Sequence, residues 1–169
     1  MNTENIELEA SARRVIALYR ERGLTVASAE SCTGGWIAKL LTDVSGSSAV
    51  FCGACVTYTN EVKERLLGVS AETVARETEV SHACAREMAV GVRRAIGTDV
   101  AVSTTGYAGP GGGTERDPVG TVYLGWSTAG AVGSERISVC GDRNAVREAA
   151  ARRALELLLE CVTATGGNG

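Results

Sequence analysis

Residues 26–43 join a short apolar segment to a helical one through a run of hydroxyls and glycines. Residues 26–30 are small and β-branched, which is typical of a buried strand. Residues 36–41 carry apolar side chains at helical spacing. A strand that turns directly into a helix leaves backbone N–H groups and the positive end of a helix dipole at the join. The pattern predicts an α/β fold with a functional turn at residues 31–35.

The hydroxyls in this turn have two interpretations. Ser31 can be a nucleophile while the free N–H groups of the helix hold an oxyanion or a phosphate. In the other interpretation, Ser31 or Thr33 only caps the helix. This stretch alone leaves both alternatives open.

Length and charge narrow the class of protein. With 169 residues, the chain is long enough for one domain with a sizeable core. A net charge of −3 gives no basic excess, so we expect no nucleic-acid partner. No apolar run is long enough to span a bilayer, and the first residues are polar rather than signal-like. We therefore expect no membrane partner, a cytoplasmic location and reduced cysteines.

Cysteine and histidine chemistry is disfavoured by position. Cys52 and Cys55 form a CxxC, yet they lie inside a predicted strand and no second ligand pair accompanies them. His82 is the only histidine, and it lies at a predicted helix start, where capping or exposure is favoured over catalysis. We expect structural cysteines, no metal site and no cofactor. A thiol redox protein that uses Cys52 and Cys55 is the weaker alternative.

Hydrophobic periodicity predicts the order of elements. Helices are expected over 5–22, 36–43, 60–67 with Asn60 as its cap, 70–77, 81–96, and from a cap at Asp142 to a frayed tail beginning at Thr163. Strands are expected over 26–30, 49–59, 99–105, 119–127 and 133–139, the last two as a hairpin. This order indicates an α/β layered single domain with a mixed, partly parallel sheet flanked by helices. Its strand ends at Ser31, 58–63 and 105–113 should share one edge, where open α/β sheets bind ligands.

Four motifs then occur in a recognisable order. They are AESCTGG at 29–35, YTNEVK at 58–63, the glycine loop at 106–113 with PVGTV at 118–122, and GDR at 141–143. Together they resemble the C-terminal domain of the CinA family, which includes nicotinamide-nucleotide amidohydrolases. The resemblance covers about residues 8–160 and implies one amidase domain over residues 1–169.

The resemblance implies hydrolysis of the carboxamide of nicotinamide mononucleotide, which gives nicotinic acid mononucleotide and ammonia. It implies Ser31 as the nucleophile and Lys63 as the base, with Tyr58 beside them as a third catalytic residue. A lysine base must be desolvated or lie near another cation, because its ordinary pKa is about 10.4. The substrate pocket is expected to involve Thr33, Gly34, Asn60, Thr105, Gly109, Gly111, Gly112 and Arg143. Arg143 is expected to contact the phosphate, which a guanidinium can bind through two parallel hydrogen bonds.

Some residues depart from the family pattern, and Cys52 and Cys55 stand where non-thiol residues are common. Tyr107 stands where a small aliphatic residue is more frequent, and we expect it to narrow or reshape the pocket. Asp117 stands where relatives often carry lysine, and its charge would oppose a phosphate near the loop. The expected partner is a small-molecule substrate, a pyridine mononucleotide, and association as a homo-oligomer is left open. The alternative function is a nucleotide-binding or regulatory module with little or no amidase turnover, which would not need Ser31, Tyr58 and Lys63 together.

Overall fold

The computed structural model describes residues 3–165, with side chains over residues 6–163. Five strands form one mixed sheet in the order β2-β1-β3-β4-β5. They are β1 (Val26–Glu30), β2 (Phe51–Val56), β3 (Val100–Gly106), β4 (Thr121–Ser127) and β5 (Val132–Ser138). Strands β2, β1 and β3 run parallel, whereas β4 is antiparallel to both β3 and β5. The predicted mixed, partly parallel sheet is confirmed.

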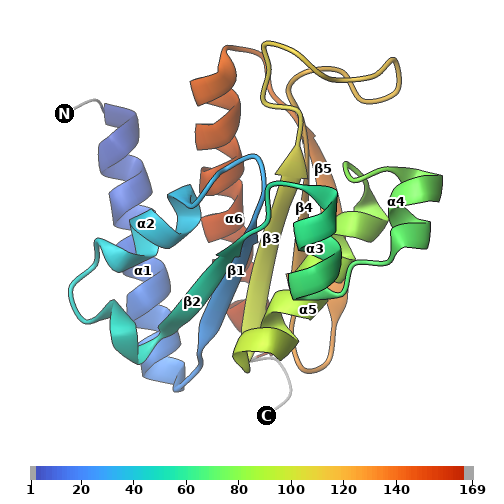
Figure 1. Ribbon diagram of the computed structural model, residues 1–169. Helices are drawn as coiled ribbons and strands as arrows, with labels where there is room; N and C mark the ends of the chain where they lie inside the picture. The colour runs from blue at the N-terminus through green and yellow to red at the C-terminus, as the bar shows by residue number, and fades with distance from the viewer. Residues whose placement is uncertain (1–2, 166–169) are drawn as a thin grey trace.

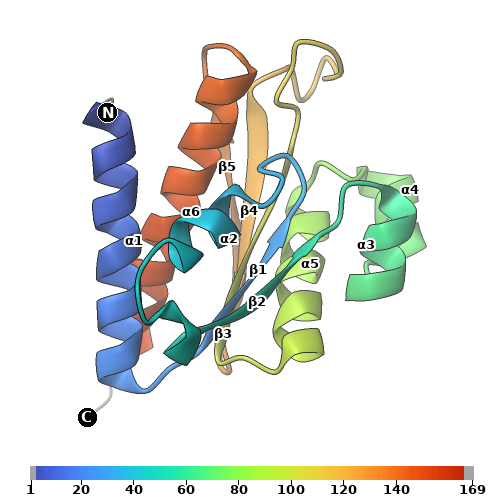
Figure 2. The same ribbon diagram turned by 60° about the vertical axis from the view of Figure 1, so that its left-hand side comes forward.

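Helices cover both faces of this sheet (Figures 1 and 2). One face carries α1 (Thr3–Arg22), α2 (Trp36–Thr42) and α6 (Arg143–Thr165). The other face carries α3 (Asn60–Leu67), α4 (Ala71–Glu77) and α5 (His82–Ile96). The result is three layers, with the sheet in the middle, as the α/β prediction requires.

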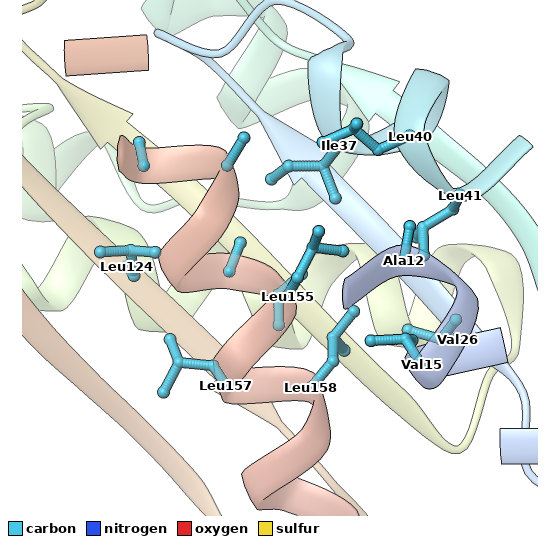
Figure 3. Packing of buried hydrophobic residues seen from close by; sticks show 14 of the residues in the cluster. Ala12, Val15, Val26, Ile37, Leu40, Leu41, Leu124, Leu155, Leu157 and Leu158 are labelled. Atoms are coloured by element: carbon cyan, nitrogen blue, oxygen red, sulfur yellow. The ribbon is translucent and has the colours of Figure 1, made fainter. Parts of the chain in front are cut away.

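The larger apolar core lies between the sheet and the α1, α2 and α6 layer (Figure 3). One apolar stripe of α1 faces this core and is fully or almost fully buried at Leu8, Ala12, Val15, Ile16 and Tyr19. Facing it are Leu155 and Leu158 of α6, which are inaccessible to solvent. The buried Tyr19 hydroxyl donates to the Leu158 carbonyl at 2.9 Å, so the core contains a satisfied polar group. A second cluster packs Met88 and Val92 of α5 against the opposite face.

Helix caps follow the sequence at most ends. The Ser70 and Ser81 hydroxyls accept from the N–H groups of Glu72 and Cys84, both at 3.2 Å. Asp142 Oδ1 accepts from the Ala145 N–H at 2.9 Å and begins α6 as predicted. The Asn60 prediction is wrong: Thr59 is the extended residue before α3, and Asn60 is already helical.

Two boundaries also differ from the sequence prediction. The strand expected over 49–59 is limited to β2, because its only partner, β1, ends with Glu30 opposite Val56. A 3-10 turn, η1 (Ser47–Ala49), precedes it. The frayed tail was expected from Thr163, but α6 continues to Thr165. The rest of that tail, residues 166–169, lies outside the described residues.

The parallel register explains where the functional segments meet. Glu30 at the end of β1 pairs with Val56 of β2 and with Thr104 of β3. The segments that follow these three strands therefore leave the sheet at one edge. Ser31 follows β1, Thr57 follows β2 and Tyr107 follows β3. The predicted convergence at one sheet edge is confirmed.

Candidate active site

A cavity of about 430 Å³ lies at this edge, between the three strand ends and the start of α6. Its size falls within the usual range for small-molecule sites, roughly 300–1,000 Å³. Six of the predicted site residues line it: Ser31, Tyr58, Asn60, Lys63, Thr105 and Arg143. Tyr107 also lines the cavity. Two carboxylates that were not among the predicted site residues, Glu61 and Glu79, line it as well.

Ser31 and Lys63 are in direct contact inside this cavity. Lys63 Nζ lies 3.1 Å from Ser31 Oγ and donates to the Thr57 carbonyl at 3.0 Å. The Ser31 N–H donates to the Thr104 carbonyl at 3.0 Å, which extends the β3 contact by one residue and fixes the serine backbone. Lys63 is only 1% exposed, because it lies one turn before Leu67 on the buried face of α3. The pair is therefore a buried amine held against a hydroxyl.

Burial is the main influence on the Lys63 amine. Removal from water lowers the pKa of Lys63 below its ordinary value, because it penalises the charged form. Negative charge on Cys84, Glu79, Cys32 or Glu61 acts in the opposite direction and raises this pKa. Burial also raises the pKa of the Cys32 thiol to about 12, so the thiol next to Ser31 stays neutral. Burial thus shifts the Lys63 amine towards its neutral form beside the Ser31 hydroxyl.

Glu30, immediately before Ser31, organises the start of α2. Its carboxylate is fully buried. Oε2 accepts from the N–H groups of Gly35 at 2.9 Å and Ile37 at 3.2 Å, and Oε1 accepts from the Ala38 N–H at 2.8 Å. The Thr33 hydroxyl donates to Oε2 at 2.7 Å. A carboxylate at a helix N-terminus also interacts favourably with the helix dipole.

This arrangement corrects the predicted roles of the helix start. Ser31 and Thr33 do not cap α2, because Gly35 occupies the cap position without a side-chain cap and the Glu30 carboxylate binds the N–H groups. Those N–H groups are therefore not free to hold an oxyanion or a phosphate. The available signal was a carboxylate at the end of a buried strand, one turn before a helix start. Residue types alone did not show that its side chain turns towards that helix.

The N–H groups of Cys32 and Thr33 make no hydrogen bond to another residue. Within residues 3–165, neither has a backbone or side-chain acceptor on a second residue, and the Cys32 N–H faces its own thiol. The next N–H, that of Gly34, donates to the Ser31 carbonyl at 3.1 Å and closes the turn. Cys32 lines the cavity next to Ser31, whereas Thr33 does not. Along the chain from the Ser31 hydroxyl, the Cys32 N–H is therefore the nearest backbone donor that no other residue binds.

Arg143 and Tyr58 form a pair at the cavity. The Arg143 guanidinium donates to the Tyr58 hydroxyl at 2.8 Å and to the Gly109 carbonyl at 2.7 Å. Tyr58 is 59% exposed, and its hydroxyl contacts Arg143 rather than Ser31 or Lys63. The structure thus groups the predicted site residues into an inner serine–lysine pair and an outer tyrosine–arginine pair.

Several predicted substrate-binding residues do not line this cavity. Thr33 is fully buried and contacts the Thr104 hydroxyl at 2.8 Å in addition to Glu30. Gly34 lines a different cavity, beside α2 and α6. Gly109 contributes its carbonyl to Arg143, and neither Gly111 nor Gly112 is among the lining residues. The glycine loop is thus brought to Arg143 through its backbone.

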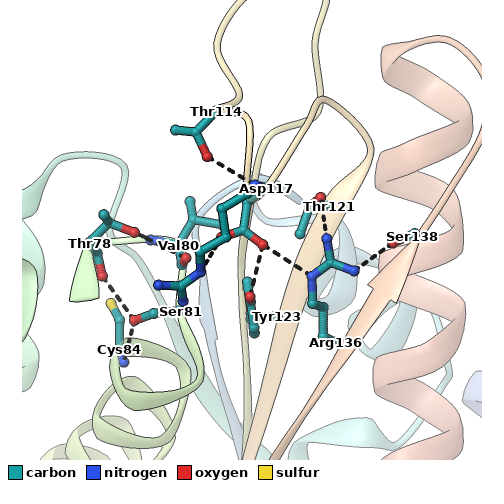
Figure 4. Close-up of polar contacts among 11 residues, drawn as sticks. Thr78, Val80, Ser81, Cys84, Thr114, Asp117, Thr121, Tyr123, Arg136 and Ser138 are labelled. Carbon is teal, nitrogen blue, oxygen red and sulfur yellow. Dashed lines mark hydrogen bonds and ion pairs between the residues drawn. The ribbon is translucent and has the colours of Figure 1, made fainter.

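The expectation that Asp117 opposes a phosphate is wrong, because its carboxylate faces a network outside the cavity (Figure 4). Asp117 is 4% exposed, and its Oδ1 accepts from the Tyr123 hydroxyl at 2.9 Å. It pairs with Arg136 at 3.1 Å and with Arg116 at 3.3 Å. Two guanidinium groups therefore balance its charge, and the contacts tie the loop to β4 and β5.

The cysteine and histidine alternatives lie away from the cavity. Cys52 and Cys55 are free thiols within β2, where neither lines the cavity. His82 begins α5, and its Nδ1 lies 3.0 Å from the Ser134 hydroxyl. Across the described chain, no three His, Cys, Asp or Glu side chains are grouped so that they could hold a metal ion. Over the same residues, no helix combines the length and the apolar character needed to cross a bilayer.

Known proteins are similar to this chain in both sequence and fold. The sequence model of the CinA C-terminal domain family matches residues 8–162. A CinA-like protein of Myxococcus xanthus is 52% identical over 154 residues, which are 90% of this chain but only 37% of that protein. The nicotinamide-nucleotide amidohydrolase PncC of Escherichia coli is 47% identical over 153 residues, which cover 90% of this chain and 93% of PncC. The crystal structure of the competence/damage inducible protein CihA from Agrobacterium tumefaciens superimposes with a TM-score of 0.88 at 42% identity, covering 90% of this chain and 94% of that one. The chain belongs to the CinA C-terminal domain family.

Proposed function

We propose that this chain hydrolyses the carboxamide of nicotinamide mononucleotide to nicotinic acid mononucleotide and ammonia, without a metal ion. The observation that carries the proposal is the buried contact of 3.1 Å between Lys63 Nζ and Ser31 Oγ, inside a cavity. The E. coli relative PncC is a nicotinamide-nucleotide amidohydrolase that this chain matches over nearly its whole length, and this similarity supports the choice of substrate.

The contacts of Lys63 suit a neutral amine. A neutral amine has two N–H bonds to donate and one lone pair that accepts a proton. One N–H can remain on the Thr57 carbonyl at 3.0 Å while the lone pair receives the Ser31 proton. Burial lowers the pKa of Lys63 and so increases the fraction of neutral amine. Lys63 is therefore suited to act as a general base.

In the first step, Ser31 Oγ attacks the carboxamide carbon as its proton passes to Lys63 Nζ. The carbonyl oxygen becomes an oxyanion, and the Cys32 N–H, which donates to no other residue, is the candidate donor that stabilises it. The Lys63 ammonium then returns the proton to the amide nitrogen. The C–N bond breaks, ammonia leaves, and an ester joins the acyl group to Ser31.

In the second step, water takes the place of ammonia. Lys63, again neutral, accepts a proton from water as the oxygen attacks the ester carbon. The bond to Ser31 Oγ breaks, and the proton passes from Lys63 to the serine oxygen. Nicotinic acid mononucleotide leaves, and the hydroxyl and the neutral amine are regenerated.

The outer pair is suited to the phosphate end of the substrate. Arg143 is exposed and already donates to two neutral oxygens, those of Tyr58 and Gly109. A phosphate can replace one of these acceptors and accept two parallel, charge-assisted hydrogen bonds from the guanidinium. We propose that Arg143 and Tyr58 bind the phosphate while Ser31 and Lys63 act on the carboxamide.

Ammonia release from nicotinamide mononucleotide, measured with a strong chelator present, tests the proposal. The wild-type protein is expected to release one ammonia for each nicotinic acid mononucleotide formed, at a rate that the chelator leaves unchanged. Ser31→Ala is the matched control, and it should bind the mononucleotide without turnover. Binding by the wild type without ammonia release would replace the proposal with the nucleotide-binding module. A loss of rate that zinc restores would overturn metal independence.

A further inference from the structure

Arg147 of α6 reaches the turn that carries Ser31, although no sequence motif marked it. Its Nε donates to the Cys32 carbonyl at 3.1 Å, and a terminal nitrogen donates to the Thr33 carbonyl at 2.9 Å. The guanidinium carbon also lies 5.3 Å from the centroid of the Trp36 ring, within cation–π range. Arg147 does not line the cavity that contains Ser31 and Lys63. It therefore contacts the backbone of the turn without facing the proposed substrate.

We propose that Arg147 is a positioning residue that holds the turn at residues 31–35 in its reactive geometry. This inference rests on the amide hydrolysis proposed above. Cys32 and Thr33 are the two residues directly after the nucleophile, and Arg147 binds both of their carbonyls. These carbonyls belong to consecutive peptide groups, so one rigid guanidinium fixes two peptide planes at once.

Each peptide group that Arg147 binds through its carbonyl also has its N–H group oriented. The peptide that contains the Thr33 carbonyl also contains the Gly34 N–H, which donates to the Ser31 carbonyl at 3.1 Å. The peptide that contains the Cys32 carbonyl ends in the unengaged Thr33 N–H. Because C=O and N–H point in opposite directions in a trans peptide, binding the carbonyls also orients these N–H groups. A cation on the carbonyl side further polarises each peptide and strengthens its N–H as a donor.

Two oppositely charged side chains thus hold the turn and the helix start. The Glu30 carboxylate accepts from the N–H groups of Gly35, Ile37 and Ala38. Arg147 donates to the preceding carbonyls. Each charge matches the partial charge of the backbone groups it meets, so loss of Arg147 leaves one of the two supports of the turn missing.

A second cavity makes this proposal testable by chemical rescue. It measures about 780 Å³, and Arg147, Trp36, Gly34 and Asn144 are among its lining residues. None of its lining residues lines the first cavity. A small cation can therefore reach the position of Arg147 without entering the cavity that contains Ser31. Guanidinium is the matching cation, and urea is its neutral analogue of similar shape.

The experiment compares kcat and KM for ammonia release in wild type, Arg147→Ala, Arg147→Lys and Arg152→Ala. Arg152 is the control, because it lies on α6 and bonds Glu7 at 2.9 Å and Glu148 at 3.2 Å instead of the turn. A misplaced reacting group costs about 100-fold in rate. Arg147→Ala should therefore lower kcat by about 10- to 100-fold, with KM changed by less than about threefold. Millimolar guanidinium should restore at least a third of the lost rate, whereas urea should not.

Backbone hydrogen exchange over residues 31–38 supplies a readout that needs no substrate. Exchange at Gly34 should accelerate in Arg147→Ala, slow again with guanidinium, and stay at the wild-type rate in Arg152→Ala. If Arg147→Ala is too unstable to study, Arg147→Lys decides, since an ammonium cannot donate to both carbonyls in the same planar geometry.

The outcomes separate the two proposals. A wild type that releases no ammonia contradicts the proposed function, and the exchange data alone then decide the role of Arg147. An active wild type with unchanged kcat in Arg147→Ala overturns the positioning role. An equal loss in Arg152→Ala, or equal recovery with urea, overturns it as well, because the effect would then reflect general destabilisation of α6.

Discussion

Two buried ionisable side chains lie beside the turn after β1: Glu30 at the end of β1 and Lys63 on α3. They differ greatly in their number of hydrogen-bond partners. Glu30 is inaccessible to solvent, and its carboxylate accepts from five donors, namely Ser28, Thr33, Gly35, Ile37 and Ala38. Lys63 is 1% exposed, and its amine has two partners, Thr57 and Ser31. One of those two partners is the proposed nucleophile.

This difference in partners separates structure from chemistry. A buried charge whose hydrogen-bonding capacity is filled stabilises its surroundings and has nothing left to react with. A buried amine with few partners tends to lose its proton instead, and it is then able to accept another. We infer that Glu30 fixes the turn and that Lys63 performs proton transfer beside it.

Lys63→Met should produce the largest effect, and it should lower the rate of ammonia release without lowering stability. General base catalysis contributes about 100- to 10,000-fold in rate, so ammonia release should fall by at least about 100-fold. The free energy of unfolding should stay equal or rise, because an apolar chain of similar length replaces a buried amine. Urea denaturation and ammonia release are measured on the same preparation. A variant within tenfold of the wild-type rate would contradict the role of Lys63.

Glu30→Gln tests the structural role of the buried carboxylate. In contrast to Lys63→Met, it should lower the free energy of unfolding. The amide can accept at only one atom, so at least one backbone N–H of α2 loses its partner. An unsatisfied buried group costs about 1–3 kcal/mol, and we expect the free energy of unfolding to fall by at least that amount. Denaturation by urea measures this loss. Unchanged stability in Glu30→Gln would show that the carboxylate does not hold the helix start.

Arg143→Ala tests a third charged side chain. Arg143 is exposed, and its only described acceptors are the neutral oxygens of Tyr58 and Gly109. A charge-assisted hydrogen bond contributes about 1.5–3 kcal/mol, so binding of nicotinamide mononucleotide should weaken by about 10- to 150-fold. Binding of the phosphate-free riboside should hardly change. Calorimetric titration with both ligands measures the difference, and equal effects on the two would exclude Arg143 as the phosphate contact.

The sequence predicted the fold well, and it predicted the site in part. Alternating and apolar segments identified all five strands, because these patterns directly reflect which side chains face the core. The parallel order of β2, β1 and β3 then accounts for why Ser31 and Lys63 meet. Their catalytic roles stay predictions.

The missed features depend on side-chain direction rather than on residue type. The N–H groups of α2 are bound by Glu30, because its side chain turns back over the helix start. Asp117 points to Arg136 and away from the cavity. Arg147 lies more than a hundred residues from Cys32 in the chain, and only the packing of α6 beside α2 brings them together.

Glu79→Gln should have the smallest effect, and it refines the account of Lys63. Glu79 lines the cavity, and its carboxylate raises the pKa of Lys63 against the lowering caused by burial. Removing this charge should lower the pKa of Lys63 further, while Cys84, Cys32 and Glu61 remain. The pH at which kcat/KM reaches half its maximum should therefore move to lower values. A shift to higher pH would contradict the stated influence of Glu79.

The pH dependence of kcat/KM for ammonia release tests the central claim most directly, because it reports the ionisation of groups in the free enzyme. Lys63 must be neutral to accept the Ser31 proton, so activity should rise with pH through the pKa of Lys63. Since burial lowers this pKa, the midpoint should lie clearly below the ordinary lysine value of about 10.4. The same rise should be absent from the residual activity of Lys63→Met. A midpoint at or above the ordinary lysine value, or an unchanged rise in Lys63→Met, would contradict the claim that a buried, neutral Lys63 activates Ser31.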